Sequence, residues 1–378
     1  MPPDTTPWAW PVMYDAQRTI LLDVLFHGSR SRADLARRSG LSRTTLTRLT
    51  RDLVNFGFVR EGETAAPNGR GRPSEMLDLR VEAAYFVGIK LTGDTLYTVV
   101  IDLAASILMS EEHSLVSKDV EDVVALIDSI VARLRVQFVR FAAVGVCLAG
   151  TTQIDHEHLV VRNSPFLGWD DVRLADLITA KTGLPTTVSN DARALTAAHH
   201  SFGAGVGCSS LVVIALGMGI GAGIVVDDEI VGGEESSPGK IGHVPVAIDG
   251  PTCARGHIGC ASAFVTSPSI IRNAGGDGSY DDVVRRCEDG DATALAAFTA
   301  AGRALGIVIA QVVNLVGPEK VVVTGEGLAV FDFAERAVRG ALEDWLDPEA
   351  SAVMLEVHPF RFADFAWGAA ISALRALM

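Results

Sequence analysis

The sequence predicts a mixed α/β protein in which a small N-terminal helical domain precedes a larger, two-lobed α/β body. Three observations support this fold class. Residues 15–53 contain three segments with helical periodicity, residues 83–107 and 208–230 share one plan of strands and turns, and positive charge gathers at the N-terminal end. With 378 residues, the chain is long enough for two or three domains.

Formal charge is distributed unevenly along the chain. Residues 1–80 hold twelve arginines, no lysine and nine acidic residues, a charge of +3, whereas the rest holds 20 basic and 37 acidic residues, a charge of −17. A basic end on an acidic body is typical of a nucleic-acid-binding segment. Five cysteines, an odd number, favour a reduced cytoplasmic protein over a disulfide framework. The longest apolar run noted, residues 211–226, is shorter than the roughly 18–20 residues of a membrane helix, so we expect no membrane insertion.

Residues 15–80 are predicted to form a winged helix-turn-helix domain. Residues 15–27 have one apolar helical face, and a short second helix follows Ser31. Gly40 stops that helix, and Ser42 caps a third one. Helix, short helix, glycine turn and polar-faced helix together indicate DNA binding.

The third helix is the predicted DNA-reading element. Leu46, Leu49 and Leu53 recur at helical spacing and are expected to face inward. The third helix of such a domain lies in the major groove of DNA, with its N-terminal residues nearest the base edges. The polar residues left on its surface are the predicted DNA contacts: Ser42, Arg43, Thr44, Thr45, Thr47, Arg48 and Arg51.

A wing is predicted from two short strands, residues 56–60 and 75–79, around a polar loop. The loop carries Arg70 and Arg72 beside glycines, which let the backbone lie close to DNA. Extended arginines suit a narrow, strongly negative minor groove. The alternative is an ordinary solvated turn, but the position directly after a helix-turn-helix favours DNA contact.

The remaining chain is predicted to form a single body with internal symmetry. Residues 83–107 form the pattern strand, turn, strand, turn and third strand, and residues 208–230 repeat it. This doubled unit is expected of the actin-like ATPase (ribonuclease H-like) fold, which has two α/β lobes around a cleft. The predicted organisation is a flexible arm, a winged helix-turn-helix domain and an effector-binding body, at residues 1–14, 15–80 and 83–378.

Residues 211–262 carry a family signature. The segments are Leu216-Gly217-Met218-Gly219-Ile220-Gly221-Ala222-Gly223, then Gly239-Lys240-Ile241-Gly242-His243, then Cys253-Ala254-Arg255-Gly256-His257-Ile258-Gly259-Cys260. They resemble the ROK family of sugar kinases and sugar-responsive repressors, whose patterns are L-G-T-G-I-G-x-G, A-G-E-x-G-H and C-x-C-G-x-x-G-C-L-E. The resemblance extends from about residue 15, because the winged helix-turn-helix resembles that of the family's repressors. It implies a homodimer or tetramer that senses a sugar or sugar phosphate.

The resemblance also implies a ligand site made of Asn190, Asp191, Lys240, His243 and Ser262. In the family, the residue matching Asn190 holds the sugar and the one matching Asp191 is the catalytic base. By themselves, Asn190 and Asp191 are better explained as helix caps. Lys240 and Ser262 stand where the family has carboxylates, which favours an anionic ligand such as a sugar acid or sugar phosphate. The alternative is a vestigial pocket, with Lys240 in solvent or paired with Asp191.

Three positions predict that kinase activity is lost. Lys90 and Met218 replace residues of the family's two phosphate loops, and Glu326 stands where a glycine is usual near the adenosine site. Phosphoryl transfer depends on positioning and on charge neutralisation by metal and hydrogen-bond donors. We therefore expect no enzyme activity, with Asp191 a vestigial base.

The zinc motif is also incomplete in the sequence. His243, Cys253 and Cys260 resemble three of the family's four structural zinc ligands, but the fourth is Arg255, which has no lone pair to donate. His257, two residues on, is an alternative ligand, and a metal-free loop is the other. We expect no cofactor, and less than one tightly bound zinc per chain.

These observations predict a DNA-binding transcriptional regulator, a repressor of carbohydrate-related genes that responds to a sugar-derived effector. The alternatives are an active sugar kinase with an accessory DNA-binding domain and a regulator controlled by a protein partner.

Overall fold

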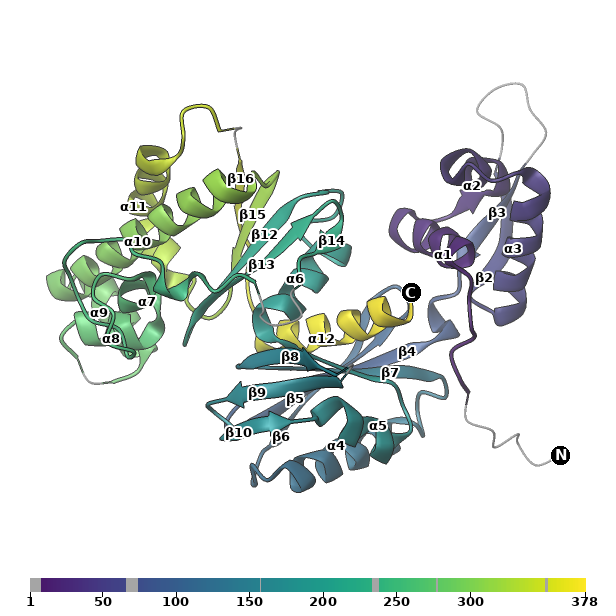
Figure 1. The fold of residues 1–378 in the computed structure, drawn as a ribbon, viewed down its shortest axis with the longest axis horizontal. Helices are drawn as coiled ribbons and strands as arrows, with labels where there is room; N and C mark the ends of the chain where they lie inside the picture. Colours follow the sequence, from purple (N-terminus) through teal and green to yellow (C-terminus); the bar gives the residue numbers. More distant parts are fainter. Residues whose placement is uncertain (1–7, 66–73, 157, 233–237, 277, 351–352) are drawn as a thin grey trace. The chain divides into compact units, whose positions relative to one another are not determined.

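Two units divide the chain, and each is described by itself. A computed structural model describes residues 8–65, 74–156, 158–232, 238–276, 278–350 and 353–378 (Figure 1). Unit 1 comprises residues 1–150, 155–189 and 365–378, and unit 2 comprises residues 151–154 and 190–364.

Unit 1 begins with the predicted helix-turn-helix. Its helices are α1 (Asp15–His27), α2 (Arg32–Ser39) and α3 (Arg43–Phe56). Strands β1 (Arg30–Ser31), β2 (Val59–Ala65) and β3 (Ser74–Leu79) form a sheet in the order β1-β3-β2. Gly40 and Gly57, both left-handed, end α2 and α3, so the strand expected from residue 56 begins only at Val59.

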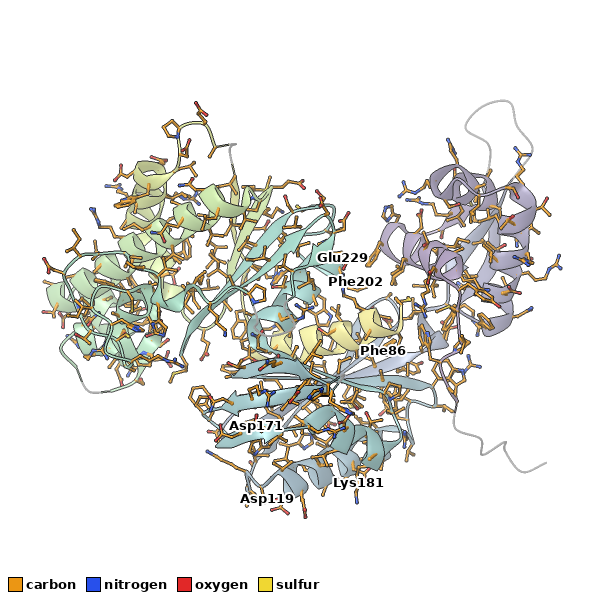
Figure 2. The ribbon with its side chains drawn as sticks, in the orientation of Figure 1. Phe86, Asp119, Asp171, Lys181, Phe202 and Glu229 are labelled. Atoms are coloured by element: carbon orange, nitrogen blue, oxygen red, sulfur yellow. The ribbon has the colours of Figure 1, made fainter. Side chains whose placement is uncertain are left out.

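Residues 8–14 correct the expectation of a loose arm. They form no helix or strand, yet the side chain of Met13 is only 4% exposed. The ring of Trp10 lies 4.6 Å from that of Phe58 and 5.9 Å from that of Phe86, which Figure 2 labels. Aromatic packing therefore orders this segment.

The rest of unit 1 is built on a five-stranded sheet in the order β11-β7-β4-β5-β6. Helix α12 (Phe362–Leu377) lies directly on two of its strands, because a Cβ at Gly88 or Gly145 would come within 2 Å of helix carbonyl oxygens. The strands are β4 (Tyr85–Leu91), β5 (Thr95–Asp102), β6 (Ile107–Ser114), β7 (Phe141–Leu148) and β11 (Thr186–Asn190); the other helices are α4 (Val120–Leu134), α5 (Leu174–Thr182) and the 3₁₀ turn η1 (Val81–Ala83). A smaller sheet has the order β10-β9-β8, from Trp169–Val172, His158–Ser164 and Thr151–Asp155.

Unit 2 repeats this plan in a sheet ordered β14-β13-β12-β15-β16. As in β4–β5–β6, two antiparallel pairings are followed by a parallel strand beside the first. The predicted doubled unit is therefore confirmed. The strands are β12 (Leu211–Leu216), β13 (Ile220–Val226), β14 (Glu229–Ile230), β15 (Lys320–Thr324) and β16 (Met354–Val357); the helices are α6 (Asp191–Phe202), η2 (Ile241–His243), α7 (Ala261–Val265), α8 (Ser267–Asn273), α9 (Tyr280–Glu288), α10 (Ala292–Val316) and α11 (Ala329–Trp345).

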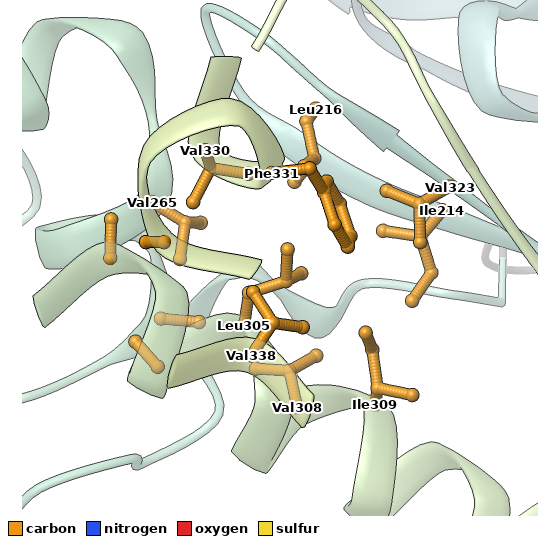
Figure 3. Packing of buried hydrophobic residues seen from close by; sticks show 14 of the residues in the cluster. Ile214, Leu216, Val265, Leu305, Val308, Ile309, Val323, Val330, Phe331 and Val338 are labelled. Atoms are coloured by element: carbon orange, nitrogen blue, oxygen red, sulfur yellow. The ribbon is translucent and has the colours of Figure 1, made fainter. Parts of the chain in front are cut away.

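The core of unit 2 lies between this sheet and α10 and α11 (Figure 3). Leu305, Val308 and Ile309 of α10 pack with Val338 of α11 and with sheet residues such as Ile214. Among the described helices, α10 alone is long and apolar enough to cross a membrane, but 61% of its most apolar window is buried inside the structure. That burial is typical of a core helix.

Candidate DNA interface, ligand site and metal centre

The surface of α3 presents three arginines that no described carboxylate pairs with. Arg43, Arg48 and Arg51 are exposed, and none has an ion-pair partner within the described residues. The arginines of α2 differ: Arg37 pairs with Asp34, and Arg38 pairs with Asp23. The cations of α3 are thus available to an external anion, as DNA phosphates and base acceptors require.

The remaining predicted DNA contacts on α3 differ in whether their hydroxyl groups already make hydrogen bonds within the helix. The hydroxyl of Ser42 accepts a hydrogen bond from the backbone N–H of Thr45 and so caps the helix. Thr47 donates to the carbonyl of Arg43, whereas Thr44 is exposed. The other two predicted contacts, Arg70 and Arg72, lie outside the described residues.

The predicted ligand residues are gathered around strand β13. Asn190 caps α6, since its Oδ1 accepts a hydrogen bond of 2.8 Å from the backbone N–H of Arg193. The first turn of α6 contacts β13, where a Cβ at Gly221 would lie 3.6 Å from Ala192. The predicted capping role of Asn190 is therefore observed.

The second segment of the ligand site reaches the same strand. The backbone N–H of Ala222 donates to the carbonyl of Gly239 over 2.9 Å, directly before Lys240. A Cβ at Gly242 would lie 2.7 Å from Oγ of Ser262 and 3.3 Å from the carbonyl of Ile220. Strand β13 thus brings together three segments that are far apart in the sequence.

Lys240 is exposed, and no ion pair joins it to Asp191 or to another described carboxylate. Of the two placements expected for a vestigial pocket, the structure shows the exposed Lys240 and not a pair with Asp191.

Arg193 is a residue of this region that sequence reasoning missed. Its guanidinium is half-buried, and Nη1 donates to the carbonyl of Val231 over 3.0 Å. Burial lowers the pKa of Arg193, and no described carboxylate lies within ion-pair distance. The available signal was a cation in the first turn of a helix, where the helix dipole disfavours positive charge.

Four potential metal ligands meet in one cluster. The donor atoms of His243, Cys253, His257 and Cys260 all lie within 4.8 Å of one another. Nδ1 of His243 is 3.9 Å from Sγ of Cys253 and 3.7 Å from Sγ of Cys260, and Nδ1 of His257 is 3.7 Å from Sγ of Cys253. Tetrahedral zinc at its usual bond lengths separates such donors by about 3.5–3.8 Å. The four side chains therefore fit zinc, with His257, the alternative fourth donor left open by the sequence, beside the other three.

The loop itself creates this proximity. The backbone N–H of Cys253 donates to the carbonyl of His257, and Gly256 and Gly259 adopt left-handed backbone angles that turn the chain back. Burial, with nearby His257 and Arg255, lowers the pKa of His243. Burial raises the pKa of the Cys253 thiol, but hydrogen bonds from backbone N–H groups of Arg255 and His257 outweigh it and lower the pKa overall. A neutral imidazole and a thiolate are the forms that bind metal.

Comparison with known families identifies the chain. The profile of the ROK family matches residues 86–375, and that of the IclR helix-turn-helix domain matches residues 21–63. The chain belongs to the ROK family. This confirms the resemblance and the fold expected from the signature of residues 211–262.

Relatives of this ROK protein include repressors. It is 27% identical to the DNA-binding transcriptional repressor Mlc of Escherichia coli over 80% of this chain and 78% of Mlc. It is 24% identical to the xylose repressor of Bacillus subtilis over 81% of this chain and 80% of that protein. A crystal structure of a ROK family transcriptional regulator, a homologue of E. coli Mlc, matches with TM-score 0.82 and 25% identity over 96% of each chain. The prediction of a ROK transcriptional regulator is confirmed.

ROK sugar kinases are related through the body alone. A ROK glucokinase from Streptomyces griseus, solved with glucose and AMPPNP, matches with TM-score 0.64 and 25% identity over 77% of this chain and 99% of its own. At the positions predicted to depart from the kinase pattern, Met218 is 52% exposed on its glycine loop, and Glu326 packs directly against Gly217. Lys90 is buried, with its ammonium 4.8 Å from the ring centre of Phe365.

Proposed function

We propose that this ROK-family regulator is a cytoplasmic repressor of carbohydrate-related genes, and that a sugar-derived effector bound beside β13 changes its affinity for operator DNA. The observation that carries the proposal is the exposed row of Arg43, Arg48 and Arg51 on α3, ahead of a ROK body. The xylose repressor and the glucokinase support a sugar as the class of effector, because their names and ligands are sugars.

The test uses the full-length protein and DNA selected by it from a random library. Fluorescence anisotropy should show specific binding that weakens with salt, as phosphate neutralisation requires. Arg43→Ala should weaken this binding, whereas Arg37→Ala, which removes an arginine paired with Asp34, should change it little. A protein that selects no sequence would contradict the proposal.

We also propose that the body has no kinase activity. Phosphate loops hold nucleotides through backbone donors and a metal-organising carboxylate. Here Lys90, in β4, occupies a position matched to the first loop, and the carboxylate of Glu326 lies against Gly217 of the second. An assay of ATP consumption with a panel of hexoses should show no turnover above that of the Asp191→Asn variant.

The metal proposal concerns stability rather than chemistry. We propose that His243, Cys253, His257 and Cys260 hold one structural zinc ion. When bound, the ion would join η2 to the loop of residues 253–260, and a closed four-ligand site leaves no position for catalysis. The same loop precedes Ser262, so the cluster would also fix one side of the ligand site.

A further inference from the structure

The half-buried guanidinium of Arg193 has no ion-pair partner among the described residues. By contrast, Arg162 pairs with Asp155 and Asp171, and Arg286 pairs with Asp291. The guanidinium of Arg193 makes one described hydrogen bond, to the neutral carbonyl of Val231. A guanidinium has five N–H donors, so most of those on Arg193 have no described protein acceptor.

The position of Arg193 adds to this electrostatic cost. It lies in the first turn of α6, where the aligned peptide dipoles carry partial positive charge. Removing a cation from water without a counter-ion costs free energy that the single bond to Val231 offsets only in part. An anion bound at the guanidinium would therefore lower the free energy of this arrangement.

The described neighbours of the guanidinium include a glycine and two polar residues. The would-be Cβ of Gly232 lies 3.6 and 3.7 Å from Nη1 and Nη2, so Gly232 itself places no side chain beside them. Asn190 and Asp191, the polar residues matched to sugar binding, are three and two positions before Arg193, at the start of the same helix. Lys240, by contrast, is exposed, and its charge is already satisfied by water.

We propose that Arg193 binds an oxyanion of the effector, so that the effector is an anionic sugar rather than a neutral one. This inference rests on the proposed effector site beside β13. The planar guanidinium can hold a phosphate or a carboxylate through two parallel hydrogen bonds, a geometry that a lysine ammonium does not offer. Sugar phosphates and sugar acids share this chemistry, and the experiment separates them.

The experiment measures binding to full-length protein by calorimetry and by the rise in melting temperature that a native-state ligand causes. The probes are glucose, N-acetylglucosamine and xylose, the phosphates of each, the corresponding sugar acids, and inorganic phosphate. Wild type is compared with Arg193→Gln and Arg193→Lys. Arg303→Gln is the matched control, because it removes an exposed arginine from the same unit.

At least one anionic probe should bind wild type about tenfold or more tightly than the neutral sugar from which it derives. Arg193→Gln should abolish that difference, Arg193→Lys should restore only part of it, and Arg303→Gln should preserve it. Preference for phosphates over acids, or the reverse, identifies the anion.

Two results would overturn the inference directly: wild type prefers no anionic probe, or the preference survives Arg193→Gln. A third is that Arg193→Gln weakens the binding of neutral and anionic probes equally. That result would mean that Arg193 only positions the backbone at Val231. Operator binding is measured on the same samples without probe. If wild type does not bind operator DNA, the proposed function is contradicted. If it binds operator DNA but prefers no anionic probe, only this inference is contradicted.

Discussion

The arginines of α3 and the charged and polar groups of unit 2 differ in one physical respect, their exposure. Arg48 and its neighbours are exposed, so water satisfies them until DNA arrives. Arg193 and His199, and the cysteines of the metal cluster, are partly or wholly buried, so their charges and hydrogen-bonding groups must be satisfied within unit 2 or by a ligand. The comparison teaches that substitutions on α3 should affect binding and spare folding, whereas substitutions in unit 2 should affect stability.

Substitutions in the metal cluster should have the largest effect on the free energy of unfolding. Wild type should contain one zinc per chain, and Cys260→Ser and His257→Ala should each lose most of it. Unfolding free energy should fall by at least about 4 kcal/mol, the linkage expected for a metal present at a thousand times its dissociation constant. Elemental analysis and chemical denaturation measure both quantities.

Cys208→Ser is the control, because Cys208 is free and lies outside the cluster. Full retention of zinc in His257→Ala would remove His257 from the ligand set and restore the incomplete motif predicted from the sequence.

His199 should make unit 2 sensitive to acid. Burial, with a smaller contribution from His358 and an opposing one from Glu356, lowers the pKa of His199 to about 4, from 6.5. Since the unfolded chain takes up the proton near pH 6.5 and the folded one only near pH 4, stability should fall as pH drops through this window, by up to about 3 kcal/mol. Denaturation of His199→Gln should show a flatter pH profile. His156→Gln, at an exposed position, should not change the profile.

The contact between α10 and α11 should respond to a single methyl group. A Cβ at Gly306 would lie 2.2 Å from the carbonyl oxygen of Val338, so Gly306→Ala should destabilise by about 1–3 kcal/mol. Gly340→Ala on α11 meets nothing within 4 Å and should stabilise by about 0.5–1 kcal/mol, through helix propensity alone. Equal melting temperatures for the two variants would contradict the packing described.

Arg48→Ala should have the smallest effect on folding. If Arg48 reads a base, discrimination between selected and scrambled DNA should fall by about 1–3 kcal/mol, with unfolding free energy changed by less than about 0.5 kcal/mol. Competition anisotropy and denaturation measure the two quantities. Uniform weakening on all DNA would assign Arg48 to a phosphate, and a large loss of stability would break the comparison between α3 and unit 2.

Several features follow from the sequence by itself, because they depend on neighbours within about four residues. Leu46, Leu49 and Leu53 are buried at helical spacing, which leaves the arginines of α3 outside. Ser42 caps α3 as predicted. The glycine loops of residues 211–262 identified the ROK family, since each motif is contiguous.

Tertiary structure alone decided the features that depend on distant residues. Trp10 packs against Phe58 and Phe86, so the described part of the arm expected to be flexible, residues 8–14, is packed. His257 comes within reach of the other three potential ligands only because its loop folds back toward His243. Arg193 differs from an ordinary surface arginine through its burial and because no carboxylate among the described residues lies within ion-pair distance. Burial and charge pairing are properties of three-dimensional proximity, and a linear pattern does not contain them.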